Sequence, residues 1–486
     1  MADKPNIVLI FPDQHRGDVM GCAGNPVAQT PNLDRLASEG VRFPRCCTNS
    51  PLCMPARASL ISGQYVNLHG VWHNWNAADR HGPSHVRNIR DSGYHTAVIG
   101  KTHLYPHEGA DHTSKHVQEL KDWGYEDTHE ITGPIASASV DSPHTDYLTE
   151  KKLLNAYRQP IFNYVRGLWR GYLHPWEELP CLIPSEDHAD MYTARKSAEW
   201  ICNYKSDKPF YLQVCFPGPH DPFDSPAEYR AMYDPEKIPL AIMDTPEPPV
   251  APYVERMLRA SRLDNMTESH NRVMRTYYYG KVTLIDTGIG LILKALEDRG
   301  LMDNTWIIYT SDHGEMLGDH RLSHKEVFYE GALKIPCIIR PPKGVKGWKS
   351  KALTDQIDVA ATILDIAGAE PFKRSDGRSL VQNVRATPDT SDAHQGKEVV
   401  FSEVAFYSMV LTDRYKMVVN SLILEPLELY DMVDDPDELN NLVRDPSLKN
   451  VCDELSERYI SYLLGHLDEA RLKVSREIVA ARQARA

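Results

Sequence analysis

The chain has 486 residues, of which 42% are hydrophobic and 25% charged, a composition typical of a globular protein large enough for a main domain and a smaller second unit. Its formal net charge of -13 argues against nucleic acid as the main partner, because phosphate binding needs a basic face. The sequence lacks a run of about 18 apolar residues, so we expect no membrane span.

The N-terminus passes from a short polar start directly into an apolar run, without the pattern of a secretory signal, so we expect a cytoplasmic protein. The nine cysteines are scattered and odd in number, and several lie inside apolar runs. We therefore interpret them as buried, reduced thiols, with the exception of Cys53.

Taken in chain order, the predicted elements alternate between strands and helices. Residues 6–11 form a short apolar run typical of a buried strand, and a helix follows with Thr30 as its N-cap, Pro31 in the first helical position and Gly40 at its end. Further strands are predicted at residues 95–99, 209–216, 306–310 and 335–340, and helices at 282–296 and 355–367. This alternation predicts an α/β fold whose mostly parallel central sheet is flanked by helices.

Two stretches are less regular. Residues 131–190 are rich in aromatics and prolines without a steady period, and we interpret them as an insertion that shapes the pocket or a subunit contact. Residues 374–397 are polar and read as a linker or surface excursion, followed by short strands at 399–406, 408–413 and 415–420 and by a terminal helix. We predict a catalytic domain over residues 1–370 and a smaller C-terminal α+β subdomain, with an antiparallel sheet and a helix, over 371–486.

The most specific motif surrounds Cys53. Cys53, Pro55 and Arg57 form C-x-P-x-R, preceded by Pro51 and followed by A-S-L-x-S-G within a helix that ends at Gly63. With these flanking residues, the sequence resembles the formylglycine-dependent sulfatases of the alkaline-phosphatase-like superfamily, close to the branch of arylsulfatases and phosphonate monoester hydrolases. The resemblance runs from residue 6 to the LYD…DPDELNNL segment, and so covers most of the chain.

The resemblance implies that a formylglycine-generating enzyme oxidises Cys53 to an aldehyde. The hydrated aldehyde carries two hydroxyls: one attacks sulfur or phosphorus, and the other then allows the inorganic anion to leave. The resemblance also implies a divalent metal bound by Asp13, Gln14, Asp312 and His313 together with the modified Cys53. It favours Ca²⁺, while Mn²⁺ or Mg²⁺ is the second choice, since the oxygen-rich set includes one imidazole.

Further residues match family positions around the substrate. The resemblance implies that Lys101 holds the substrate anion, that His103 assists the formylglycine hydroxyl, and that His220 binds the ester oxygen or protonates the leaving group. Lys325 would contact sulfate and leaving-group oxygens, and Arg57 would support the formylglycine and the metal ligands. Asn74 is a candidate substrate contact, with His73 and Asn76 as rivals for that role.

The favoured activity is hydrolysis of sulfate monoesters of the arylsulfatase type. The alternative is a phosphonate monoester hydrolase or phosphodiesterase, or an enzyme promiscuous for both, because the Asp13-Gln14 pair and the twelve residues from His313 to Lys325 resemble that branch. That branch, however, has a tyrosine and a threonine where this chain has Lys101 and His103, and a lysine suits a fully ionised ester. A catalytically inactive binding protein would be expected to lack part of this set, and none is missing.

We expect a small-molecule sulfate ester as substrate, and either the aromatic insertion or the terminal helix could form the contact of a homo-oligomer.

Overall fold

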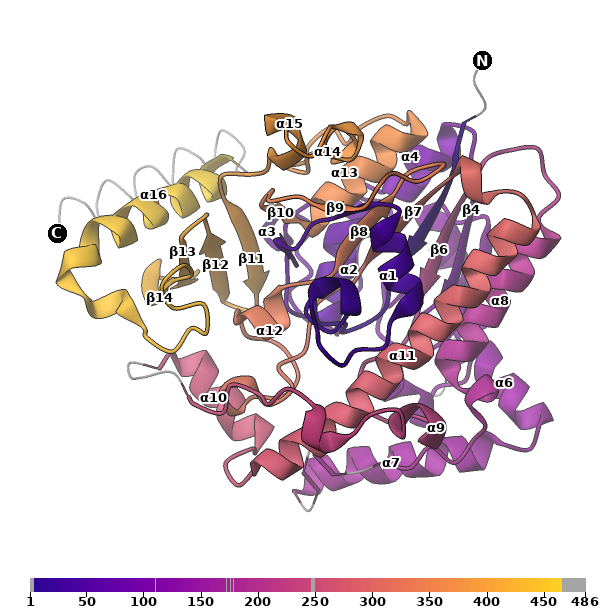
Figure 1. Cartoon of the computed structure of the whole chain (residues 1–486), viewed down its shortest axis with the longest axis horizontal. Helices are drawn as coiled ribbons and strands as arrows, with labels where there is room; N and C mark the ends of the chain where they lie inside the picture. The colour runs from indigo at the N-terminus through magenta and orange to yellow at the C-terminus, as the bar shows by residue number, and fades with distance from the viewer. Residues whose placement is uncertain are drawn as a thin grey trace.

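A mostly parallel sheet forms the centre of the computed structural model, which describes residues 4–109, 111–171, 173, 174, 176, 177, 179–245 and 250–465 (Figure 1). Within these residues, the sheet has eight strands in the order β5-β4-β6-β1-β7-β8-β2-β9. The first five strands in this order run parallel to one another: β5 (Asp127–Glu130), β4 (His95–Gly100), β6 (Phe210–Cys215), β1 (Asn6–Ile10) and β7 (Thr305–Thr310). The predicted sheet is thus confirmed.

One edge of the sheet reverses direction. Strand β8 (Cys337–Arg340) pairs antiparallel with β7, and β2 (Val41–Arg42) pairs antiparallel with β8 and parallel with β9 (Trp348–Lys349). The predicted strand at 335–340 therefore exists, but it begins at Cys337 and is antiparallel. A separate parallel pair joins β3 (Cys46–Cys47) to β10 (Thr354–Asp355).

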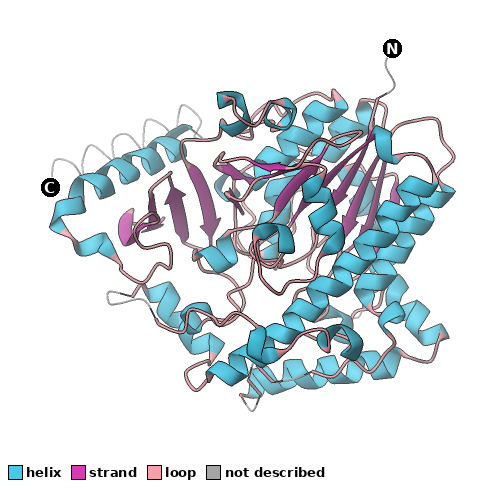
Figure 2. Ribbon diagram, viewed as in Figure 1, coloured by secondary structure: helices cyan, strands magenta, loops and turns pink. Residues whose placement is uncertain are grey.

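Helices cover both faces of the sheet (Figure 2). Ile7, Leu9 and Phe11 pack on one face with α2 (Cys53–Ser62), α4 (His85–Asp91) and α13 (Gln356–Ala367). Val8 and Ile10 pack on the other with α1 (Pro31–Ser38), α8 (Ala189–Asn203) and α11 (Glu268–Asp298). Because successive strand side chains point to opposite faces, a strand buried on both faces is apolar at successive positions, as β1 is from Ile7 to Ile10.

The start of α1 is capped from another helix. Thr30 occupies the predicted N-cap position, but its side chain makes no capping bond. The carboxylate of Asp286, on α11, instead accepts the backbone N–H groups of Asn32 at 3.1 Å and Leu33 at 2.8 Å. The helix therefore has its free N–H groups satisfied through the tertiary contact between α1 and α11.

Helices occupy both stretches that lack a steady sequence period. The segment 131–190 contains α6 (Pro143–Glu150) and α7 (Leu154–Arg170), which includes Pro160 and packs in a small cluster of its own. The segment 374–397 contains α14 (Val381–Arg385) and α15 (Ser391–His394), and Leu380 and Val384 join the main core beside α13. The polar stretch is thus a covering layer rather than a linker.

The predicted C-terminal antiparallel sheet is confirmed. Its strands are β11 (Val400–Val404), β12 (Tyr407–Leu411), β13 (Tyr415–Asn420) and β14 (Glu425–Asp431), the last of which the sequence did not reveal. Helix α16 (Lys449–Gly465) packs on it through Leu455 and Tyr459. Residues 466–486 of the predicted terminal helix lie outside the described residues. The division at residue 370 stays a prediction.

Shorter helices complete the described chain: α3 (Val66–His69), α5 (Val117–Trp123), α9 (Ala227–Arg230), α10 (Pro252–Ser261) and α12 (Glu330–Leu333). Among the described residues, we find no helix with both the length and the apolar character needed to cross a bilayer.

Candidate active site

The predicted site residues meet at the carboxyl ends of four neighbouring parallel strands. Asp13 follows β1, Lys101 follows β4, His220 follows β6 and Asp312 follows β7, and these strands are adjacent in the sheet. Cys53 enters from the first turn of α2, which packs across this edge. The fold therefore brings together residues that are up to 299 positions apart, at the edge where parallel sheets form their sites.

Cys53 lies at the centre of this group. Its Sγ is 3.1 Å from Nε2 of His313 and 3.7 Å from Oδ1 of Asp13, and the residue is buried. It opens helix α2, whose N-cap Leu52 offers no side-chain bond. The side-chain oxygen of Asn74 accepts the backbone N–H of Met54 at 3.0 Å and serves that end of the helix instead.

Four side chains form a compact group of metal-ligand type. One ligand atom from each of Asp13, Cys53, Asp312 and His313 lies within 4.8 Å of the others, and all four residues are buried. His313 donates from Nδ1 to the carbonyl of Gly314 at 2.9 Å, which leaves Nε2 directed at Cys53. Such a second hydrogen bond is the usual way in which proteins fix a metal-binding imidazole. The donor set therefore fits a divalent cation.

Arg57 joins the two carboxylates of this group. Its Nη2 lies 3.0 Å from Oδ2 of Asp13, and its Nε donates to Oδ2 of Asp312 at 2.9 Å. Its Nη1 donates to the carbonyl of Lys101 at 2.6 Å. The guanidinium is buried and lies 5.1 Å from the centre of the Phe11 ring. Arg57 therefore holds the loops after β1, β4 and β7 in one arrangement.

Gln14 connects the metal-type group to the predicted substrate cations. Its backbone N–H donates to Oδ1 of Asp312 at 2.9 Å, and its backbone lies in the left-handed region at φ 70°. Its side-chain oxygen accepts from Nζ of Lys325, and its side-chain nitrogen donates to Glu315. Lys325 also lies 2.8 Å from Nε2 of His220. The role of Gln14 as a metal ligand stays a prediction, since its oxygen binds Lys325 here.

Positive charge dominates the surroundings of Cys53. Burial raises the pKa of the Cys53 thiol, and so does the charge of Asp13. The charges of Lys325, His313 and Lys101 outweigh both and hold that pKa well below its ordinary value. The site therefore favours an anion at the position of the Cys53 side chain.

The Lys101 ammonium lies against Oδ2 of Asp13, and His103 lies beside Cys53. Burial, and after it the charge of Lys101, lower the pKa of His103 to about 3. Its Nδ1 has no hydrogen-bond partner in the part of the chain that the structure describes. The imidazole is thus neutral at ordinary pH.

His73 and Asn76, the rivals of Asn74 for a substrate contact, have different surroundings from Asn74. The ring of His73 stacks on that of Trp75, with ring centroids 4.5 Å apart, and Asn76 is exposed. Sequence reasoning missed three other residues: Asp221, Glu315 and His324 contact Gln14, His220 or one another. Each lies within two residues of a predicted site residue, and that proximity was the available signal.

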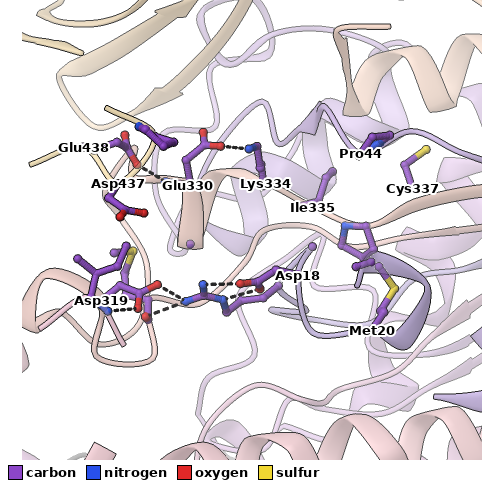
Figure 3. Close-up of a pocket in the computed structure, with 18 of the residues that line it drawn as sticks. Asp18, Met20, Pro44, Asp319, Glu330, Lys334, Ile335, Cys337, Asp437 and Glu438 are labelled. Atoms are coloured by element: carbon purple, nitrogen blue, oxygen red, sulfur yellow. Dashed lines mark hydrogen bonds and ion pairs between the residues drawn. The ribbon is translucent and has the colours of Figure 1, made fainter. Parts of the chain in front are cut away.

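A separate cavity of about 340 Å³ lies beside the loop that follows Gln14 (Figure 3). Arg16, on its wall, pairs with Asp18 at 2.8 Å and with Asp319 at 2.7 Å, and Lys334 pairs with Glu330. None of the predicted site residues lines this cavity. We therefore place the chemistry at Cys53 and not here.

Comparison with known proteins agrees with this arrangement. The model of the family described as sulfatase matches residues 5–369, and that described as N-sulphoglucosamine sulphohydrolase, C-terminal, matches residues 318–463. The chain is 30% identical to an arylsulfatase of Clostridium perfringens, and the match covers 95% of each chain. It is 27% identical to a choline-sulfatase of Rhizobium meliloti, and that match covers 91% of this chain and 83% of the choline-sulfatase. It is similar to the crystal structure of a phosphonate monoester hydrolase of Agrobacterium radiobacter, with 26% identity, a TM-score of 0.79 and coverage of 96% and 97%.

Proposed function

The chain belongs to the sulfatase family of sulfuric ester hydrolases, and from this premise we propose that it hydrolyses sulfate monoesters of the arylsulfatase type, using formylglycine made from Cys53 and one divalent metal ion. The observation that carries the proposal is the position of Cys53. It is a buried member of the metal-type group, and it lies close to the positive charges of Lys325 and Lys101. Hydrated formylglycine there would supply the attacking hydroxyl and a second hydroxyl that allows sulfate to leave.

Asp13, Asp312 and the Nε2 atom of His313 would hold the metal with the modified Cys53, and Gln14 would join them if its oxygen exchanged Lys325 for the cation. The mixed oxygen and nitrogen set supports Ca²⁺, with Mn²⁺ or Mg²⁺ as second choice. When bound, the cation would supply positive charge beside the reacting ester and favour the ionised nucleophile.

The basic residues divide the remaining work by position. Lys101 and Lys325 lie close to Cys53 and would bind the sulfate oxygens, where negative charge grows in the transition state. His103 is held neutral and would assist the attacking hydroxyl by accepting a hydrogen bond from it. His220 contacts Lys325 at 2.8 Å and would serve the oxygen of the leaving group. Asn74, whose side chain caps the start of α2 through the backbone N–H of Met54, is the proposed further substrate contact.

A second candidate function is hydrolysis of phosphonate monoesters or phosphodiesters. The likeness to the Agrobacterium radiobacter phosphonate monoester hydrolase supports it. So does the contact between Gln14 and Lys325, because it joins the Asp13-Gln14 pair to the end of the twelve-residue spacing from His313 to Lys325, the two features that resemble that branch. Lys101 and His103 favour the sulfatase, because a buried ammonium beside the nucleophile suits a fully ionised ester end. The two transition states are similar in shape, so we expect some activity on both. The formylglycine-generating partner, the homo-oligomer and the cytoplasmic location stay predictions.

The test compares kcat/KM for para-nitrophenyl sulfate and para-nitrophenyl phenylphosphonate on one metal-loaded preparation. We expect a large excess for the sulfate. The double variant Lys101→Tyr, His103→Thr should move the ratio toward the phosphonate, since it installs the residues of that branch. A wild-type excess for the phosphonate would overturn the assignment to sulfate esters.

A further inference from the structure

The carboxylate of Asp221 meets side chains from three strand-end loops. Its Oδ1 lies 3.2 Å from Nδ1 of His220, 3.3 Å from Nδ1 of His324 and 3.5 Å from Nε2 of Gln14. Asp221 is 1% exposed, and its Oδ2 accepts no hydrogen bond from the described residues. A buried carboxylate is costly unless it is paired, so its position among these groups requires an explanation beyond packing.

His220 is held through Asp221 in one orientation. The main-chain carbonyl of Asp221 accepts a hydrogen bond from Nδ1 of His220 at 2.6 Å, and the carboxylate of the same residue lies 3.2 Å from that nitrogen. The other ring nitrogen, Nε2, therefore accepts a hydrogen bond from the Lys325 ammonium, 2.8 Å from its Nζ. A carboxylate beside one nitrogen of an imidazole fixes the ring and stabilises its protonated form.

We propose that Asp221 is a positioning residue that enables His220 to protonate the leaving group. This rests on the proposed function. When the sulfate oxygens of the substrate take over the Lys325 ammonium, Nε2 of His220 is free to bind a proton from water. As the nucleophile bonds to sulfur and the bond between sulfur and the ester oxygen breaks, the electron pair of the broken bond stays on the ester oxygen, and the proton on Nε2 moves to it. A neutral alcohol or phenol leaves, His220 becomes neutral, and water returns the proton before the next cycle. Asp221 keeps the imidazolium in place until the transfer.

The competing explanation is that Asp221 only joins loops. Glu315 provides a matched comparison, because it is also buried and acidic and also contacts this network. Its carboxylate accepts from Gln14 and from the backbone N–H of His324, but no contact joins it to His220 among the described residues. A role in joining loops is therefore shared by Asp221 and Glu315, whereas an effect through His220 belongs to Asp221 alone.

The test measures kcat/KM on phenyl sulfate and para-nitrophenyl sulfate for wild type, Asp221→Asn, His220→Asn, the Asp221/His220 double variant and Glu315→Gln. Phenol, with a pKa of about 10, leaves as an anion with difficulty, whereas the nitrophenolate leaves more readily. A positioned proton donor contributes about 10²–10⁴-fold. We therefore expect Asp221→Asn to lower the value for phenyl sulfate by about 10-fold to 100-fold more than that for the nitrophenyl ester. Glu315→Gln should change both equally.

The double variant should match His220→Asn, since Asp221 then has no ring to support. An equal loss on both esters in Asp221→Asn, alongside an unequal loss in His220→Asn, would overturn the inference while leaving the proposed function intact. An equal loss in His220→Asn would instead show that His220 is not the proton donor, and would overturn both that role and the inference, while the hydrolysis of sulfate esters would still be tested by the wild-type rates. If wild type prefers phosphonates, phenyl and nitrophenyl phenylphosphonates replace the sulfates. Asp221→Ser replaces the asparagine variant should that one fail to fold.

Discussion

Arg57 neutralises two carboxylates that we expect to share a metal ion, so its replacement should destabilise the protein in a metal-dependent way. Its guanidinium lies 3.0 Å from Oδ2 of Asp13 and 2.9 Å from Oδ2 of Asp312, and all three side chains are at most 2% exposed. Removing one partner of a buried ion pair costs about 3–5 kcal/mol, because the remaining charge is left uncompensated. Arg57→Met leaves Asp312 without its paired cation and Asp13 with Lys101 alone, and a bound metal ion would compensate both carboxylates.

Urea unfolding of wild type and Arg57→Met, each in EDTA and in Ca²⁺, measures this effect. We expect Arg57→Met to lose about 3–5 kcal/mol of unfolding free energy in EDTA and clearly less in Ca²⁺. Arg414→Met is the matched control, because Arg414 also pairs with two carboxylates, Asp431 and Asp434, but is itself 51% exposed. It should change little in either medium. An equal loss for Arg57→Met in EDTA and Ca²⁺ would refute the reasoning that Asp13 and Asp312 hold a metal.

Three further predictions concern catalysis, pH and backbone fit. Lys325→Met should lower kcat/KM for a sulfate ester by about 10²–10³-fold, because one fixed positive group is lost from the transition state, and a loss under tenfold would contradict its role. Burial raises the pKa of Asp286 to about 6, above its value in the unfolded chain, because the folded protein favours the protonated carboxyl. The contribution of Asp286 to the unfolding free energy is therefore fully present below about pH 4 and is lost as the pH rises through 6. The unfolding free energy of wild type relative to Asp286→Asn should fall over that range, and a flat difference would be inconsistent with this. Gly100 has φ 108°, and a Cβ there would lie 1.9 Å from the carbonyl oxygen of Cys215. Gly100→Ala should therefore lower the unfolding free energy by more than about 1 kcal/mol. An unchanged unfolding free energy in urea would show that the neighbouring strands can move apart to admit the methyl group.

The sheet was predictable because its strands are apolar on both faces. Residues 7–11 and 306–309 are apolar runs that have few other interpretations in a chain of this size. The pairs Asp13-Gln14 and Asp312-His313 could then be placed at one edge, since parallel strands bring their carboxyl ends together. Direct contacts among Asp13, Cys53, Asp312 and His313 agree with that placement.

The remainder depends on contacts distant in sequence. The cap of α1 comes from Asp286, 254 positions after Asn32, and no local pattern at Thr30 could reveal it. Helix α7 carries Pro160 in its interior, where a proline normally ends a helix, and it packs in a small cluster separate from the main core. The bond between Gln14 and Lys325 likewise depends on how two loops meet, which spacing alone does not determine.

The central claim is that the nucleophile is made from Cys53, and the most direct measurement is mass spectrometry of the peptide containing Cys53, made on protein whose activity has been measured in the same preparation. The account predicts formylglycine at that position in a fraction that rises and falls with specific activity, and no sulfate ester hydrolysis by Cys53→Ala. Fully active protein whose Cys53 is entirely an unmodified thiol would contradict it.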